Sequence, residues 1–341
     1  MGNNSKTRAF DVVDNKGNRS NNSRQKLVIA IFVVIILILL AFATLIIGKV
    51  IENGGSNDNP IIPPIISNVT YVPKEAGDVK VGNLLLINNQ FGHELTSDFS
   101  NMVNVKNYQR AAENASKTEI NGLLTYTVTA DRIVLEKNTL DAFNKMILDY
   151  CATLNLTGAN QNTASNIEVA WGGYSEATKH EYESDLNTPS VGKEYWDHAL
   201  GTTVTLKRYK PSGAITEDML QSDFEWIYQN AHKYGFILRY PNSCADHTGF
   251  GGEKRVHLRF VGIAHATYIY ENELCLEKYL ELLRTQHSSD NPLSFTAEGK
   301  TYDVYYVAFS GNPTSIPVPK NNDNYSISGD NMNGFIVTVE K

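Results

Sequence analysis

The sequence predicts an α+β fold, and three observations in one stretch support this prediction. Apolar residues recur at i, i+3, i+4 and i+7 from Phe224 to Ala231, which is the spacing of one helix face. Gly235 follows the last periodic residue, where a left-handed C-cap favours glycine. The segments 236–240 and 256–261 then have the composition of short strands. We therefore expect one helix and two strands to converge here, with His257 inside the second strand.

The helix in this stretch has a predicted start. Ser222 and Glu225 have the spacing of a capping box, in which each side chain accepts a backbone N–H at the open helix end.

Further elements are expected on both sides of this stretch. Residues 82–88 have the pattern of a buried strand, and 123–135 are rich enough in β-branched and aromatic residues for one or two more. A helix is predicted to begin at Asn138 or Thr139 and to bury an apolar face that ends at Cys151.

A strand is predicted over 166–174, ending in the Gly172–Gly173 turn, and a second helix over 178–186. Strand-forming segments separated by Pro and Gly then fill 292–341.

The N-terminal region predicts a membrane anchor. Residues 27–48 form an uncharged apolar run, long enough to cross a bilayer core of about 30 Å as a helix. Residues 1–26 read as a disordered tail with six basic and two acidic residues, which predicts that the N-terminus is cytoplasmic and the main domain extracytoplasmic. Residues 49–70 are a linker containing Gly, Asn and Pro. A cleaved signal peptide ending near Ala43 is the alternative, although the apolar run continues beyond that position.

Charge and cysteine content limit the partners. The chain has a net charge of −7 despite its basic tail, so the remainder is acidic and does not suit nucleic acid or anionic lipid headgroups. Cys151, Cys244 and Cys275 contain no C-x-x-C pair, so we expect at most one disulfide and mainly free, buried thiols. The sequence does not predict an oligomeric state.

Several segments together resemble a known family. They are WIYQNAHKYGFILRYP from Trp226, TGF from Thr248, HLRFVG from His257, Ala264-His265-Ala266, and LCLEKYLELL from Leu274. They are similar to the C-terminal half of VanY-type D-alanyl-D-alanine carboxypeptidases, and the resemblance extends from about Leu84 to Arg284. It implies the LAS-type fold, a small and mostly antiparallel sheet with helices packed around it. It also implies zinc as cofactor and peptidoglycan stem peptides as ligands, from which these peptidases remove the terminal D-Ala.

In this family, two zinc ligands are the His and the Asp of an S-x-H-x-x-G-x-A-x-D motif. The third is the His of an E-x-x-H motif. On this resemblance His198 and His257 stand at the two histidine positions, and Gly201 keeps the glycine of the turn between the first two ligands. Thr205 occupies the position of the aspartate, and a neutral hydroxyl is a poor zinc ligand beside a carboxylate. Zinc binding is therefore expected to be weak or absent, and the alternative for both histidines is simple burial with hydrogen-bonded neighbours.

The family's catalytic base and carboxylate-binding arginine are also altered. Glu253 is the candidate base, but Lys254 stands where the glutamate belongs when counted back from His257, and a β-bulge would be needed to re-aim Glu253. Tyr174 and Ser175 follow Gly173 where the family has Tyr and Arg, so they are the candidate substrate-binding residues. Serine cannot form the bidentate pair of an arginine with a carboxylate.

Two functions remain open from these residues. The first is an anchored cell-wall protein with a VanY-like domain at 71–287 and a β-rich extension at 288–341, which binds stem peptides with weak or lost catalysis. The second is an active zinc D,D-carboxypeptidase with a non-standard third ligand. A single-span envelope sensor or scaffold is a further alternative, but the short tail carries no signalling motif.

Overall fold

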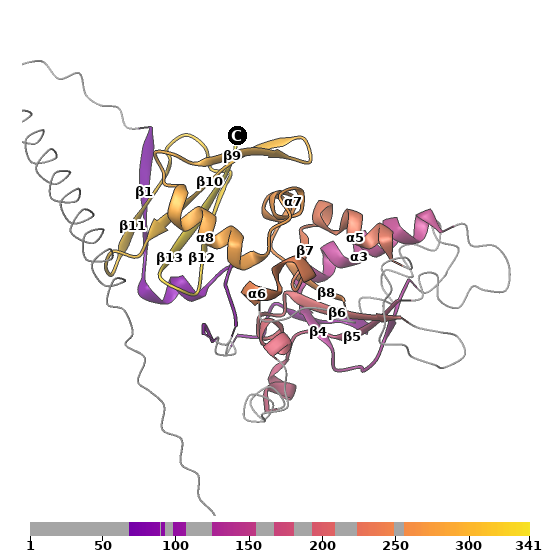
Figure 1. Cartoon of the computed structure of the whole chain (residues 1–341). Helices are drawn as coiled ribbons and strands as arrows, with labels where there is room; N and C mark the ends of the chain where they lie inside the picture. The colour runs from indigo at the N-terminus through magenta and orange to yellow at the C-terminus, as the bar shows by residue number, and fades with distance from the viewer. Residues whose placement is uncertain are drawn as a thin grey trace, which may run out of the picture. The chain divides into compact units, whose positions relative to one another are not determined.

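The computed structural model describes residues 68–88, 90–92, 98–106, 125–154, 167–180, 193–208, 224–248 and 256–341, with backbone alone at 193–196. The segment Ser67–Lys341 is one compact unit (Figure 1). Among the described residues, no helix combines the length and apolar character of a bilayer span, and the predicted anchor at 27–48 lies outside them.

The central sheet of the described region has five strands in the order β3-β5-β6-β8-β7. β3 and β5 run parallel and the other neighbours are antiparallel. The strands are β3 (Thr127–Val128), β5 (Ile167–Trp171), β6 (Thr203–Arg208), β7 (Phe236–Leu238) and β8 (Val256–Phe260). This agrees with the mostly antiparallel sheet that the resemblance implies, with one parallel pair in addition.

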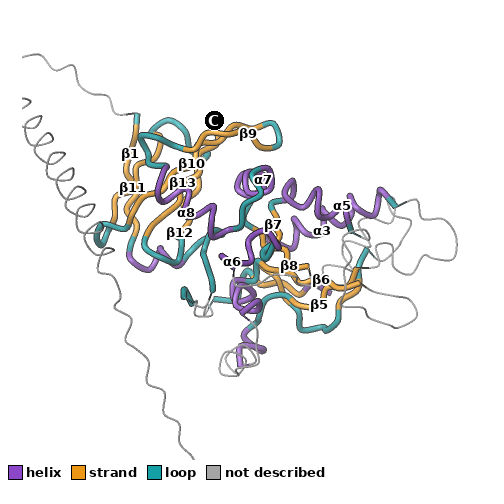
Figure 2. The backbone as a smooth tube through the Cα atoms, in the orientation of Figure 1, coloured by secondary structure: helices purple, strands orange, loops and turns teal. Residues whose placement is uncertain are grey.

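The remaining described strands form three smaller sheets (Figure 2). A four-stranded sheet has the order β12-β13-β10-β9, and the pairs β1-β11 and β2-β4 are antiparallel. These strands are β1 (Val69–Lys74), β2 (Met102–Asn104), β4 (Val134–Glu136), β9 (Leu293–Ala297), β10 (Lys300–Ala308), β11 (Thr314–Pro319), β12 (Tyr325–Gly329) and β13 (Gly334–Glu340). The pairing of β1 with β11 joins the beginning of the folded unit to its C-terminal part.

The described α-helices are α3 (Lys137–Thr153), α5 (Glu225–Asn230), α6 (Ala245–Thr248), α7 (Ile263–Glu271) and α8 (Leu276–Gln286). Short 3₁₀ turns are η1 (Ala76–Lys80), η2 (Glu176–Thr178), η3 (Lys193–Leu200), η5 (Ala231–Tyr234) and η6 (Asn242–Cys244).

The two faces of the central sheet differ in character. One face buries Val169, Val204, Leu258 and Phe236 against α3, which runs along the sheet in Figure 1. Because side chains alternate along a strand, the neighbouring residues point to the opposite face. That opposite face carries the side chains of Thr203, Thr205, His257 and Arg259 beside the apolar Ile237, and its polar part holds the candidate site.

The predicted strand at 82–88 is wrong. Its apolar residues from Leu84 to Ile87 are buried as expected, but their backbone forms no ladder. Side chains take its carbonyls instead: Arg259 donates to Leu85, Arg239 to Ile87, and an amide side chain to Leu86. A continuous apolar run therefore indicated burial correctly and secondary structure incorrectly.

Other predicted elements are present, and one of them begins at a different residue. Gly235 ends η5 in the left-handed region at φ 87°, as the C-cap prediction requires. The region 125–135 contains β3 and the start of β4. The first long helix is capped by the side chain of Glu136, which accepts from the Thr139 N–H, so the prediction of Asn138 or Thr139 as its start is wrong.

Three further predictions concern residues outside the described part, namely Ser222, Glu253 and the helix beyond residue 180. All three cysteines are described, and they are buried free thiols.

Candidate functional site

Two histidines and a threonine converge on the polar face of the central sheet. Thr205 on β6 lies directly opposite His257 on β8. His198 comes from η3, just before the chain enters β6. Oγ1 of Thr205 lies 3.0 Å from Nε2 of His198 and 2.9 Å from Nδ1 of His257. All three side chains are at most 3% exposed, so their contacts are shielded from water.

One arrangement of protons satisfies the contacts within this cluster. Nδ1 of His198 lies 3.1 Å from the carbonyl of Thr203, which can only accept, so we assign the proton to Nδ1; the backbone of Gly172 also bonds to this ring. Burial, together with the nearby His257, holds the pKa of His198 well below its usual range, so the ring is neutral and Nε2 accepts. The Thr205 hydroxyl then donates to His198, and Nδ1 of His257 donates to Thr205.

Close packing of two glycines holds the turn that carries His198. Gly201 has a φ of 67°, which an L side chain rarely adopts. A Cβ on Gly173, at the end of β5, would lie 2.6 Å from the Cα of Gly201. Only residues without side chains let these two turns approach so closely. The glycine that the resemblance places at 201 therefore has a structural reason.

A cluster of buried ion pairs holds the same turn in place. Asp197, adjacent to His198, is fully buried and pairs with both Arg239 and Arg259. Glu277 from α8 adds a second carboxylate, 2.8 Å from Arg239. Burial disfavours the charged guanidinium, but Asp197 and Glu277 outweigh it and hold the pKa of Arg239 well above its usual range. Both arginines thus pair with carboxylates beside the turn that carries His198.

Burial, together with the neighbouring charge of Arg239, lowers the pKa of Arg259, although Asp197 opposes the shift. The two guanidinium groups and the two carboxylates balance in charge. Because Asp197 is adjacent to His198 in the chain, these ion pairs also fix the backbone that positions His198.

The candidate substrate-binding residues lie at the end of β5. Tyr174 lines a cavity of about 130 Å³ together with Trp171 and the Gly172–Gly173 turn. Ser175 instead pairs with Thr178, whose hydroxyl accepts from the Ser175 backbone N–H at 2.9 Å. Ser175 is not among the residues that line the cavity.

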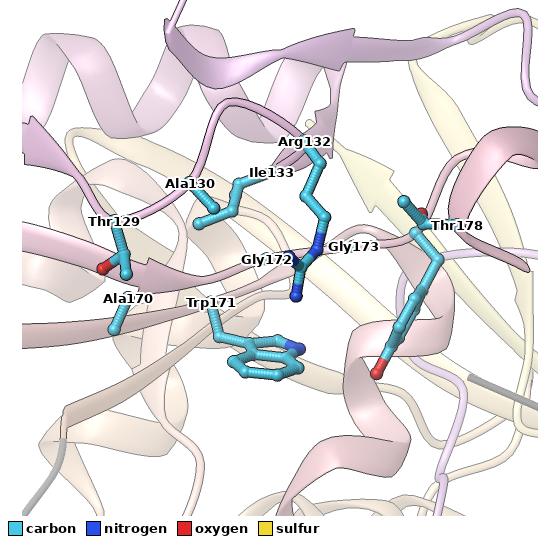
Figure 3. A pocket seen from close by; sticks show the side chains of 10 residues that line it. Thr129, Ala130, Arg132, Ile133, Ala170, Trp171, Gly172, Gly173 and Thr178 are labelled. Carbon is cyan, nitrogen blue, oxygen red and sulfur yellow. The ribbon is translucent and has the colours of Figure 1, made fainter. Parts of the chain in front are cut away.

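Sequence reasoning missed Arg132, which also lines this cavity. Figure 3 shows its side chain reaching toward Trp171 and the Gly172–Gly173 turn. Trp171 is the cross-strand neighbour of Thr205, so Trp171, Thr205 and His257 form a row across β5, β6 and β8. Arg132 lies in the loop between β3 and β4, far from the family motifs in sequence, and no spacing rule connects it to them.

The described residues meet the needs of a zinc site only in part. Nε2 of His198 presents a lone pair, and its Nδ1–H is held by a carbonyl, as in metal-binding histidines. Nδ1 of His257 would have to give up its proton, and Thr205 offers a hydroxyl where a carboxylate is needed. Within the described part of the chain, no three His, Cys, Asp or Glu residues gather at metal-binding distance. The candidate base Glu253 lies outside that part.

Comparisons with known proteins agree on one family. Residues 168–263 match the model of the VanY family, D-alanyl-D-alanine carboxypeptidase. A D-alanyl-D-alanine carboxypeptidase of Enterococcus faecium is 28% identical over 291 residues, covering 85% of this chain and 82% of the relative.

Two solved structures are also similar. The vancomycin resistance D,D-dipeptidase VanXYg, in complex with a D-Ala-D-Ala phosphinate analog, is 21% identical with a TM-score of 0.58, covering 80% of this chain and 99% of that one. A VanY D,D-pentapeptidase variant from a VanB-type resistance cassette, in complex with Zn(II), is 23% identical with a TM-score of 0.29, covering 58% and 98%. At this identity, the first of the two supports a shared fold.

Proposed function

Because the chain belongs to the VanY-type D-alanyl-D-alanine carboxypeptidase family, we propose that it is an anchored cell-wall protein that recognises peptidoglycan stem peptides and hydrolyses them weakly or not at all. In this proposal residues 27–48 span the membrane and Ser67–Lys341 lies outside the cytoplasm. The family and the resemblance to enzymes acting on peptidoglycan peptides are its premise, whereas the anchor, the location and the loss of catalysis are its new content.

The observation that carries the proposal is the hydroxyl of Thr205 between two imidazoles. Its contacts of 3.0 Å and 2.9 Å give both ring nitrogens a neutral partner, so the cluster is stable as hydrogen-bonded protein without a metal. A carboxylate at this point would be buried and would need a cation. The uncharged threonine hydroxyl thus bonds both imidazoles from the position of the family's aspartate. This supports a site that no longer binds zinc.

A bound zinc ion would supply an activated water and polarise the scissile carbonyl. His198 and His257 are the residues that would hold it, and they supply two of the three protein ligands that catalytic zinc requires. His198 is neutral and already donates its Nδ1–H to a backbone carbonyl, so it is oriented but does not release a proton to a substrate. We therefore assign this cluster a positioning role on the sheet face.

The cavity beside the cluster supports peptide recognition. The guanidinium of Arg132 reaches the turn after β5, and Trp171, which lines the same cavity, is the cross-strand neighbour of Thr205. Arginine forms bidentate, charge-assisted bonds with carboxylates. Arg132 can thus take the role of the arginine that Ser175 replaces, and bind the terminal carboxylate of a stem peptide.

The alternative is an active zinc D,D-carboxypeptidase. It requires a third ligand from residues outside the described part of the chain, with Glu253 as base. A sensor or scaffold role is compatible with the same ectodomain, but no specific contact favours it.

The test is binding of a synthetic stem pentapeptide ending in D-Ala-D-Ala to the full chain in detergent, measured by calorimetry. Arg132→Ala is expected to weaken binding by roughly 10- to 100-fold, because a hydrogen bond to a charged group contributes about 1.5–3 kcal/mol. Amidation of the peptide's C-terminus should have the same effect on the wild type and little further effect on the variant. Arg284→Ala, which removes an exposed guanidinium paired with Glu281, is the matched control. Equal affinity of Arg132→Ala and wild type would remove the carboxylate role.

A further inference from the structure

A second cavity, of about 460 Å³, lies at the opposite end of the central sheet from the cavity beside β5. It is lined by residues of η5, β7, η6 and α7, among them His232, Leu238 and Tyr270. β7 is the last strand of the sheet, so one of its edges has no neighbouring strand in the described region.

The register of β7 determines which backbone groups face this cavity. The N–H of Val261 donates to the Gly235 carbonyl, and the N–H of Arg239 donates to the carbonyl of His257, both at 2.9 Å. In an antiparallel pair, hydrogen-bonded residues alternate with residues whose N–H and C=O point away. Ile237 is therefore bonded to β8, whereas Phe236 and Leu238 direct their backbone groups outward. No described residue bonds to these outward groups.

One buried side chain in the lining lacks a hydrogen bond. His232 is 7% exposed, and its Nδ1 has no partner among the described residues. Its ring stacks on Tyr270, with centroids 4.0 Å apart and planes at 7°, so its orientation is fixed. Burial lowers the pKa of His232, which keeps the ring neutral and able to bond a polar group of a ligand.

The cavity lining also carries a negative charge, which favours a ligand with a positive charge. Glu273 is the one charged residue among the described residues that line this cavity. Its carboxylate forms no ion pair with a described residue, while its backbone N–H donates to the Tyr270 carbonyl. An apolar cavity with a single carboxylate at its rim is complementary to an apolar ligand that carries one cation.

We propose that β7 is a docking edge for an extended peptide with alternating apolar side chains and one lysine or arginine. The peptide adds a strand to the sheet by pairing with the outward groups of Phe236 and Leu238, which gives affinity through backbone bonds. Its apolar side chains enter the cavity beside Tyr270, and its cation lies against Glu273. This edge is separate from the His198 cluster and does not depend on its chemistry.

The probe is the fluorescein-labelled, capped peptide Val-Ile-Val-Lys-Val, and its anisotropy is measured with the full chain in detergent. Leu238→Pro removes one outward N–H without touching the bonds to β8, because proline is tolerated on an edge strand when its nitrogen faces outward. We expect this variant to bind at least tenfold more weakly; because the change also removes a side chain packed against the core, its melting temperature is measured to show that it is folded at the assay temperature. Glu273→Gln should weaken binding several-fold and reduce its salt dependence. Glu271→Gln, an exposed acid at the end of α7 that does not line the cavity, is the matched control.

A second measurement does not depend on the folding of any variant. The same peptide, N-methylated at alternate residues, retains its side chains but cannot form the ladder, and it should bind the wild type at least tenfold more weakly. Absence of binding by the unmethylated peptide, or equal binding by both peptides, would overturn the proposal. Because an excess of stem pentapeptide should leave the anisotropy unchanged, competition by it would also contradict a separate site.

Discussion

Replacing Thr205 by aspartate should turn the histidine cluster into a zinc site. The hydroxyl oxygen already lies 3.0 Å and 2.9 Å from the two imidazole nitrogens, so a carboxylate there completes a set of two histidines and one acid. Without metal, the new carboxyl lies at a position only 1% exposed and should destabilise the fold. With zinc, the gain follows mass action, about 2.7 kcal/mol at free zinc 100 times the dissociation constant.

The assay is thermal unfolding of the full chain with and without added zinc. A gain of that size raises the melting temperature of a domain of this size by roughly 5–11 °C. The wild type, with two imidazoles and a hydroxyl, should shift far less. Thr203→Asp is the matched control, because Thr203 lies on the same strand and face but opposite Arg259. If Thr205→Asp shows no zinc-dependent shift, or if Thr203→Asp shows an equal one, the three side chains do not have the geometry of a zinc site.

Three further outcomes follow from buried residues of the described region. Asp197→Asn should lower the free energy of unfolding by about 3–5 kcal/mol, because it leaves two buried guanidinium groups short of a carboxylate. Asp141→Asn, in an exposed ion pair with Lys137, is the control and should lower it by less than about 0.5 kcal/mol. Chemical denaturation measures both. Gly173→Ala should cost about 1–3 kcal/mol, since the added Cβ meets backbone at 2.6 Å, and the same titration measures it. Burial lowers the pKa of His265 to about 4, below its unfolded value of about 6.5. The unfolded state therefore binds the extra proton, and about 3 kcal/mol of stability present above pH 6.5 is lost on acidification toward pH 4. His265→Gln should flatten this slope, and an unchanged slope would contradict the assignment.

Sequence reasoning identified the frame of the site because local rules act there. The helix stripe from Phe224, the glycine cap at Gly235 and the strand around His257 each follow from spacing or backbone conformation. The resemblance to the VanY motif placed His198, Thr205 and His257 at one site, and in the structure their side chains lie within hydrogen-bonding distance.

The remaining features depend on contacts between distant segments. Leu84 to Ile87 were expected to form a strand, but arginine side chains from the central sheet compete for their carbonyls. Arg132 reaches the cavity from a loop whose sequence carries no motif. The contacts of Arg132, Arg239 and Arg259 are set by the tertiary fold, so a single sequence does not encode them locally. The N-cap of α3 is a different case: the Glu136 side chain reaches the Thr139 N–H only three residues away, and it was missed because cap preferences favour shorter polar residues.

Zinc content and hydrolysis in the same preparation test the central claim most directly. The full chain, purified without chelator and dialysed against a zinc buffer, is analysed for bound metal and for D-Ala release from a stem pentapeptide. We expect well under one zinc per chain and no D-Ala release above the protein-free control, while the peptide still binds. One zinc per chain together with catalytic release of D-Ala would contradict the account and establish the active carboxypeptidase.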